Sequence, residues 1–395
     1  MSQSHAQQDI SSGMVWLFAT ATGLIVANLY YAQTLIGPIS RATGLDPGAA
    51  GLIVTLTQIG YCLGLLFIVP LGDLLENRRL IFIALLTTAV ALLAASFTSS
   101  AALFLLAAFC IGLGSVAAQI VVPFTAHMAR PEKRGQTVGK VMSGLLMGIM
   151  LARPVASLVA DALSWHAIFV ISAFTTTALA FLLRARLPQR QPDSGLHYFA
   201  LLGSMWQLLK TTPILRRRAA YQACMFGAFS LFWTCVSLEL TGPYFQLSQS
   251  GVAIFALVGV AGAIASPIAG RRADQGKSRS TTAAALTLGA IAFALPLLIH
   301  STRLIDLGVL VLTSIVLDMG VSANLVTGQR AIFALPPEIR SRLNGLYMAL
   351  FFMGGALGSS LGGWMFAAHG WTGVLWTGLA FPLTALCVFV TEPRR

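Results

Sequence analysis

The chain has 395 residues, of which 56% are hydrophobic and only 10% are charged, and its mean hydropathy is +0.80. A soluble protein cannot cover its surface with so few charges, and the same composition excludes disordered, fibrous and disulfide-rich secreted classes. We therefore predict an integral membrane protein. Its formal charge of +12 fits either an anionic partner such as nucleic acid or a membrane protein that keeps its positive residues in the cytoplasm.

Apolar segments of membrane-spanning length recur along the whole chain. A hydrocarbon core about 30 Å thick needs about 20 apolar residues per helix, and prolines and charges divide the sequence into such segments. Taken in chain order, they are 14–36, 48–70, 80–98, 101–124, 138–160, 165–184, 216–241, 249–270, 281–299, 305–328, 344–367 and 371–391. The sequence thus predicts twelve transmembrane helices.

The positive residues decide how these helices are oriented. If the N-terminus is cytoplasmic, all but three of the 25 Lys and Arg residues fall in cytoplasmic connections or tails; the exceptions are Arg41, Arg303 and Arg153. Such an asymmetry is typical of membrane proteins, and it places both termini in the cytoplasm. It also accounts for the net charge without a nucleic-acid partner. The segment before the first span contains no Lys or Arg and does not resemble a signal peptide.

An internal repeat divides the chain into two halves. Pro131-Glu132-Lys133-Arg134 before the fifth span matches Pro337-Glu338-Ile339-Arg340 before the eleventh at an offset of 206 residues, and the same offset relates Trp165 to Trp371. Parallel halves of six spans each are typical of transporters. We expect an N-terminal six-helix bundle in 1–185, a cytoplasmic linker with a short surface helix in 186–212, and a C-terminal six-helix bundle in 213–395.

Several motifs resemble those of the major facilitator superfamily over essentially the whole chain. Acidic–basic turns follow spans two and eight, and three segments are similar to one bacterial branch of twelve-span drug and sugar efflux permeases. These segments are Ala27-Asn28-Leu29-Tyr30-Tyr31-Ala32-Gln33, Gly144–Arg153 and Arg340-Ser341-Arg342-Leu343-Asn344. The resemblance implies the major facilitator fold: an all-α membrane protein of two pseudo-symmetric six-helix bundles, with spans one, four, seven and ten around a central cavity. It also implies proton antiport, as in many members of that branch.

Two charged residues lie near the expected bilayer midplane, where charge is costly and marks function. Arg153 lies in span five and Asp318 in span ten, where Ser314, Asp318 and Ser322 share one helical face. We expect Asp318 to be a proton-coupling site; its alternative role is that of a structural partner for a buried polar group, including Arg153. Arg153 either contacts substrate through its fork of donors or holds the two halves together.

Polar and aromatic residues on the cavity-forming spans are candidates for substrate contact. They are Asn28, Tyr30, Tyr31, Gln33, Gln119, Arg153, Gln222, Trp233, Ser314 and Ser322. Such a lining suits a small organic solute with apolar and hydrogen-bonding parts. The alternative for each of these residues is ordinary hydrogen bonding between helices.

Charged residues on the cytoplasmic turns are candidates for a conformational latch that forms when this side closes. The set is Asp73, Arg78, Arg79, Asp274, Arg134 and Arg340. The alternative is that the acidic residues only cap helix ends.

The sequence contains no nucleotide-binding, nucleophile-elbow or zinc-protease motif, so we expect no cofactor, no metal and no enzymatic activity. We predict a monomeric secondary active transporter in the bacterial cytoplasmic (inner) membrane, which exports a small organic solute in exchange for protons. The alternative is a permease that takes up a small organic anion with Arg153 as counter-ion. A more remote alternative is a membrane receptor or enzyme that transports nothing.

Overall fold

The structure is a computed structural model that describes residues 10–130, 133–189, 197–336 and 339–392, without the side chains of 134–135, 260–264 and 273–274. The described chain is helical and contains no β-strand. The helices of the first half are α1 (Ser12–Ala27), η1 (Tyr31–Thr34), α2 (Ile36–Thr43), η2 (Pro47–Ala49), α3 (Leu52–Phe67), η3 (Val69–Asp73), α4 (Asn77–Phe97), α5 (Ala101–Ser115), α6 (Ala117–Met128), α7 (Arg134–Ala162) and α8 (Trp165–Arg186). Those that follow are α9 (Tyr198–Thr211), α10 (Pro213–Thr241), α11 (Gln249–Leu257), η4 (Val258–Ala261), α12 (Gly262–Asp274), α13 (Ser278–Leu298), α14 (Arg303–Phe333) and α15 (Arg340–Val390).

These helices make twelve crossings. Nine helical segments in the described part of the chain are long and apolar enough to span a membrane. One of them, α15, has 51 residues and forms two crossings, because Gly370 with φ 64° and ψ −160° ends one helix and starts the next. The first crossing is interrupted by η1, and the eighth by η4. The all-α fold with twelve spans that the sequence predicts is thus confirmed.

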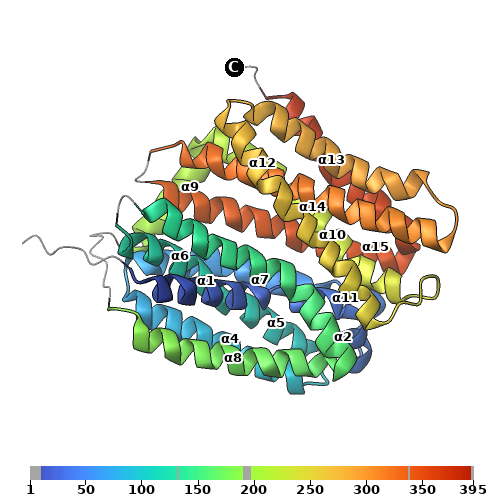
Figure 1. Ribbon diagram of the computed structural model, residues 1–395, viewed down its shortest axis with the longest axis horizontal. Helices are drawn as coiled ribbons and strands as arrows, with labels where there is room; N and C mark the ends of the chain where they lie inside the picture. Colours follow the sequence, from blue (N-terminus) through green and yellow to red (C-terminus); the bar gives the residue numbers. More distant parts are fainter. Residues whose placement is uncertain (1–9, 131–132, 190–196, 337–338, 393–395) are drawn as a thin grey trace, which may run out of the picture.

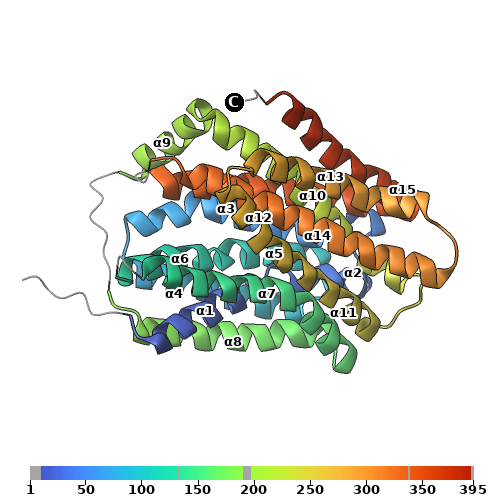
Figure 2. The ribbon, with the colours of Figure 1, turned by 45° about the horizontal axis from the view of Figure 1, so that its top comes forward.

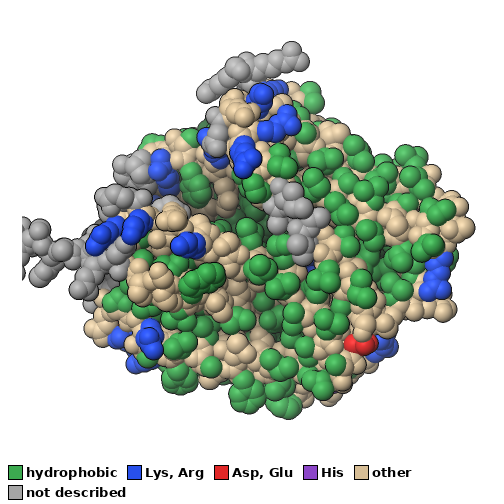
Figure 3. Space-filling model, in the orientation of Figure 1, with side chains coloured by type: hydrophobic (Ala, Val, Ile, Leu, Met, Phe, Trp, Pro, Cys, Tyr) green, Lys and Arg blue, Asp and Glu red, His purple; other side chains and the backbone are tan. Residues whose placement is uncertain are grey.

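The two halves lie side by side as separate helical bundles (Figure 1). Apolar side chains are spread over the face seen in Figure 3, and most of the Lys and Arg visible there lie toward the end of the molecule where α9 lies in Figure 1. This is the distribution expected when that end faces the cytoplasm. The short helix α9 falls within the predicted linker and lies across this end (Figure 2).

Contacts between glycines bring two helices together inside each half. A Cβ atom on Gly148 of α7 would lie 2.6 Å from the Cα of Gly23 in α1. A Cβ on Gly358 of α15 would lie 2.8 Å from the Cα of Gly227 in α10. Because any side chain would separate these backbones, the glycines allow close packing. The crossings α1–α7 and α10–α15 therefore hold each half together rather than join the halves.

Direct polar contacts join the two halves from the membrane centre to the outer side. Thr55 Oγ1 lies 2.8 Å from Ser359 Oγ, and Gln58 Nε2 donates to Ser230 Oγ at 2.8 Å. The Ser237 hydroxyl donates to the Gln33 carbonyl at 3.1 Å. All of these side chains are buried, so the outer side of the seam is closed in this structure.

The cytoplasmic end has a cleft between the halves instead. Its walls include Asp73 and Gln119 from the first half and Arg342 from the second, with α9 beside them. Helix α9 contacts both halves: the Tyr198 hydroxyl donates to the Phe67 carbonyl at 2.8 Å, and Arg342 donates to Ser204 at 2.8 Å. At this end the halves are therefore linked through α9.

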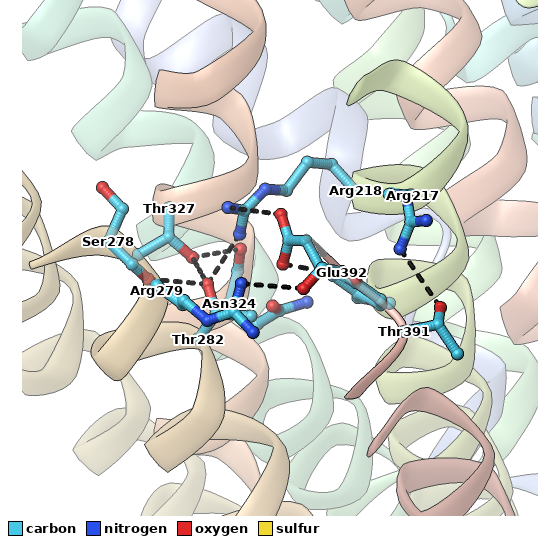
Figure 4. A network of polar contacts seen from close by, with 10 residues as sticks. Arg217, Arg218, Ser278, Arg279, Thr282, Asn324, Thr327, Thr391 and Glu392 are labelled. Atoms are coloured by element: carbon cyan, nitrogen blue, oxygen red, sulfur yellow. Dashed lines mark hydrogen bonds and ion pairs between the residues drawn. The ribbon is translucent and has the colours of Figure 1, made fainter. Parts of the chain in front are cut away.

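A polar network fastens the end of the chain to the cytoplasmic end of the second half (Figure 4). Arg218 on α10 donates to the Thr282 hydroxyl at 2.6 Å and lies 3.8 Å from the Glu392 carboxylate. Arg279 donates to the Glu392 carbonyl at 3.1 Å, and Arg217 donates to Thr391 at 3.2 Å. Residues from α10 and α13 thus hold the segment that follows α15.

This network predicts a stability difference between two neighbouring arginines. Arg218 is only 7% exposed, and it contacts both α13 and the segment that follows α15. Arg218→Leu therefore leaves Glu392 and Thr282 without this partner. We expect a loss of about 1–3 kcal/mol in the free energy of unfolding, measured by thermal unfolding of the purified protein. The exposed Arg216 is the control, and Arg216→Leu should change stability by less than about 0.5 kcal/mol. Equal losses in both variants would contradict this role.

Candidate functional site

A cavity of about 100 Å³ lies between the two halves near the middle of the spans. The first half contributes Tyr30 and one face of α7, and the second half contributes residues of α10, η4, α12, α14 and α15. Arg153 and Asp318, the two midplane charges found in the sequence, both line it. The cavity therefore brings together one charge from each half.

Arg153 is held inside a cage of aromatic rings. Its side chain is only 3% exposed, and its guanidinium carbon lies 4.1 Å from the ring centroid of Trp233, 4.9 Å from that of Phe229 and 5.6 Å from that of Tyr30. Such cation–π contacts stabilise a desolvated cation by about 2 kcal/mol or more each in favourable cases. The Nε atom also donates to Gln33 Oε1 at 3.0 Å. The cage therefore offsets part of the cost of burying this charge.

Asp318 lies on the other side of the same tryptophan. Its carboxylate is 6% exposed and accepts a hydrogen bond from Trp233 Nε1 at 3.1 Å. Trp233 thus presents its ring face to the cation and its N–H group to the anion. Since Trp233 and Asp318 belong to the second half and Arg153 to the first, this indole connects the two charges across the seam.

The two charges attract each other without direct contact. A Coulomb interaction acts between Arg153 and Asp318, yet within the described chain no Arg153 nitrogen lies within 4.0 Å of the Asp318 carboxylate. Gly259 in η4 borders both groups: a Cβ there would meet Asp318 Oδ2 at 2.9 Å and Arg153 Nη1 at 3.4 Å. A larger residue at 259 would therefore crowd both charges.

Stacked phenylalanines form the apolar wall of the cavity. The rings of Phe226 and Phe351 are 3.8 Å apart at 18°, and those of Phe226 and Phe229 are 5.2 Å apart at 17°. Trp233 is predicted from the sequence but Phe226 and Phe229 are not, although their spacing of three and four residues places all three on one helical face. This spacing is the sequence signal from which Phe226 and Phe229 could have been predicted.

Other predicted site residues lie close to this centre or away from it. Tyr30, Gln33, Trp233 and Ser322 border or contact the charged pair. Five lie elsewhere: Asn28 accepts from Ser172, Tyr31 lines a groove between α1 and α7, Gln119 donates to Tyr61 and lines the cytoplasmic cleft, Gln222 accepts from Asn324, and Ser314 donates to the Leu310 carbonyl. In this conformation those five are engaged between or within helices.

The predicted latch residues are spread along the cytoplasmic end. Asp73 lines the cleft, Arg78 lies 3.6 Å from Glu76, and the backbone N–H of Arg79 donates to Glu76. Arg340 donates to the Leu335 carbonyl at 2.8 Å. The side chains of Arg134 and Asp274 lie outside the described residues. The latch role remains a prediction.

The fold and this buried inter-half site define a membrane transporter rather than an enzyme. A family model of the Major Facilitator Superfamily matches residues 15–315 and 219–395. The chain belongs to this superfamily. It is 39% identical over 381 residues to YgaY of Escherichia coli O157:H7, described as an uncharacterized transporter, covering 96% of each chain. It is also 30% identical over 376 residues to a protein of Streptomyces coelicolor described as a probable transporter, covering 94% of this chain and 86% of that one.

Solved structures share the fold. A bacterial homolog of the human lysosomal transporter Spinster, in an inward-facing and unoccupied conformation, superposes with a TM-score of 0.77 at 13% identity and 96% coverage of both chains. The nucleoside transporter NupG superposes with a TM-score of 0.73 at 16% identity, covering 95% of this chain and 98% of that one. At these identities the likeness concerns the fold alone.

Proposed function

We propose that this protein is a proton-coupled secondary active transporter that exports a small organic solute by alternating access. The observation that carries the proposal is the meeting of Arg153 from one half and Asp318 from the other in a buried cavity, with Trp233 between them. Buried ionisable residues in membrane spans are costly and typically serve ion or substrate pathways. A pair that connects two moving halves can link protonation to their motion.

The mechanism follows from the charge on Asp318. When its carboxylate is ionised, it attracts Arg153 across the seam, and this attraction is stronger in the protein interior than in water. When it binds a proton, the attraction is lost and the halves are freer to separate at this level. Solute binding in the same cavity competes for these groups, so proton and solute exchange places during one transport cycle.

The cavity lining indicates the kind of solute. Phe226 and Phe351 offer stacked rings, whereas Ser266 and Ser322 offer hydroxyl groups beside the charged pair. Such a lining suits a small molecule that has both an apolar or aromatic part and hydrogen-bonding groups. The proposed partners are this solute, protons and the lipid of the bacterial cytoplasmic membrane. We propose that the protein works as a monomer.

Asp318→Asn tests the proton-coupling role directly. A thermal-shift screen of the purified protein against a solute library at two pH values first identifies a ligand. We then expect Asp318→Asn to reduce the flux driven by an imposed pH gradient in proteoliposomes at least about tenfold, a change of about 1.4 kcal/mol. Asparagine keeps the acceptor for Trp233, so the fold is preserved. Asp46→Asn, on an exposed outer turn, is the control, and undiminished proton-driven flux in Asp318→Asn would contradict the assignment.

Uptake of a small organic anion is the second candidate. Arg153 borders the cavity, and within the described chain only its Nε atom, of its three guanidinium nitrogens, donates a hydrogen bond. Its terminal nitrogens can therefore bind a carboxylate or phosphate in a fork geometry. Flux measured with the pH gradient reversed, for matched anionic and neutral solutes, distinguishes the candidates: uptake that requires the anion supports this second function.

A further inference from the structure

A second pocket, of about 410 Å³, lies at the outer end of the second half. Its walls come from the outer ends of α10, α13 and α14 and from the start of the last crossing at Trp371. It shares no lining residue with the central cavity. Whatever binds here is therefore bound separately from the Arg153–Asp318 centre.

Two carboxylates face this pocket, and they are held differently. Asp306 is 6% exposed; it accepts from the Tyr244 hydroxyl at 2.7 Å and lies 2.8 Å from His300 Nδ1. The hydrogen bond to Asp306 raises the pKa of Tyr244. Glu239, in contrast, is partly buried, and its carboxylate has no hydrogen bond or ion pair within the described chain. The nearby Arg303 donates to the Phe245 carbonyl. Glu239 is therefore the carboxylate of this pocket that no side chain of the described residues engages.

Aromatic rings line the same pocket as the Glu239 carboxylate. Trp371, Tyr244 and Phe245 all line the pocket, and the Tyr244 and Phe245 rings are 4.8 Å apart at 80°. The negative face of an aromatic ring attracts organic cations, with tryptophan the most effective. A carboxylate together with several rings is the chemistry that recognises a substituted ammonium group.

The fold does not require an open pocket at this place, because the equivalent place in the first half is filled by side chains. At the equivalent position Trp165 is packed by Phe104 and Phe169, each with a ring centroid 6.0 Å away. Phe169 corresponds to Leu375 at the offset of 206 residues, and Leu375 lines the pocket under Trp371. The repeat fills this place with rings in one half and leaves it open, beside a carboxylate, in the other.

We propose that this outer pocket is a binding site for a small organic cation, namely an aryl-alkyl amine in its protonated form. The ammonium group pairs with Glu239, and the apolar part contacts Trp371 and Leu375. Asp306 is not the primary partner because Tyr244 and His300 already engage it. The site opens on the side opposite the cytoplasmic cleft, so it samples amines outside the cell.

The test uses the whole purified protein in nanodiscs and radiolabelled phenethylamine as the probe. We expect saturable binding at pH 7 that unlabelled phenethylamine displaces and that its neutral analogue 2-phenylethanol does not. Glu239→Gln should weaken binding at least tenfold, or about 1.4 kcal/mol. Trp371→Leu should also weaken it, whereas Trp371→Phe should restore part of the affinity because a ring remains.

Two matched variants distinguish this pocket from the other carboxylates of the protein. Asp46→Asn removes another outer carboxylate and should leave the affinity unchanged. Asp318→Asn removes the acidic group of the central cavity and should also leave it unchanged. If Asp318→Asn abolishes binding while Glu239→Gln does not, the amine occupies the central cavity and the proposal is wrong. Equal affinities of wild type and Glu239→Gln would likewise overturn it.

Discussion

A disulfide between positions 55 and 359 should stop transport completely. Thr55 on α3 and Ser359 on α15 are buried, and their hydroxyl oxygens are 2.8 Å apart across the outer seam. Opening the outer side has to separate them, so a covalent link holds the protein with that side closed. With Thr55→Cys and Ser359→Cys in a background whose five native cysteines are replaced by alanine, we expect oxidation to abolish flux and reductant to restore it.

A second cysteine pair provides the control for this lock. The hydroxyls of Thr282 and Thr327 are 3.4 Å apart, and both residues belong to the second half. In the proposed alternating access each half moves as one body, so Thr282→Cys with Thr327→Cys should allow oxidation without loss of flux. Full transport by the oxidised 55–359 pair would show that the outer contact does not open during transport.

Removing the charge of Arg153 should have the largest effect on stability. Arg153→Met leaves Asp318 without its counter-charge and Gln33 without its donor, in a site from which water is largely excluded. Breaking a buried charge pair typically costs about 3–5 kcal/mol, so we expect a loss of this size in the free energy of unfolding, together with loss of transport. Thermal unfolding in detergent and proteoliposome flux measure the two effects.

A double variant separates stability from function. Replacing both partners of a buried pair is often close to neutral, so Arg153→Met with Asp318→Asn should recover most of the lost stability but none of the proton-driven flux. Arg184 is the matched control: it also stacks on an aromatic ring, 4.6 Å from Phe82, but it is exposed. Arg184→Met should cost less than about 1 kcal/mol. If the double variant is as unstable as Arg153→Met, the pair does not interact energetically.

Hydropathy and charge predict the crossings because every crossing requires a long apolar segment. This signal lies within the segment itself and does not depend on which helices pack against it. The interruptions at η1 and η4 are not predicted, since Tyr31–Thr34 and Val258–Ala261 do not differ enough in composition from their flanks. In the structure η1 contacts α7 and α10, and η4 contacts α14, so both turns pack against residues far away in the sequence. The residues at which a span begins and ends are also poorly predicted, because they are set by the connecting loops rather than by hydropathy.

The residues of the site likewise divide into those that the sequence reveals and those that it does not. Arg153 and Asp318 are found from the sequence because a charge stands out within an apolar span. Phe226 and Phe229 are missed because an aromatic residue there has no such contrast. Gln222 and Ser314 show the opposite difficulty, since a polar residue in a span looks the same whether it faces a cavity or, as here, a neighbouring helix or its own backbone.

The glycine crossings of α1 with α7 and of α10 with α15 have a mechanical consequence. Close-packed interiors have low compressibility and transmit strain, so we expect each half to move as a stiff lever with its pivot near the membrane centre. The ends of the spans lie about 15 Å from that centre, since the hydrocarbon core is about 30 Å thick. A displacement too small to disturb the packing around Trp233 is therefore magnified at the membrane surfaces. In the mechanism that we propose, a single proton at the pivot thus controls an opening wide enough for a solute.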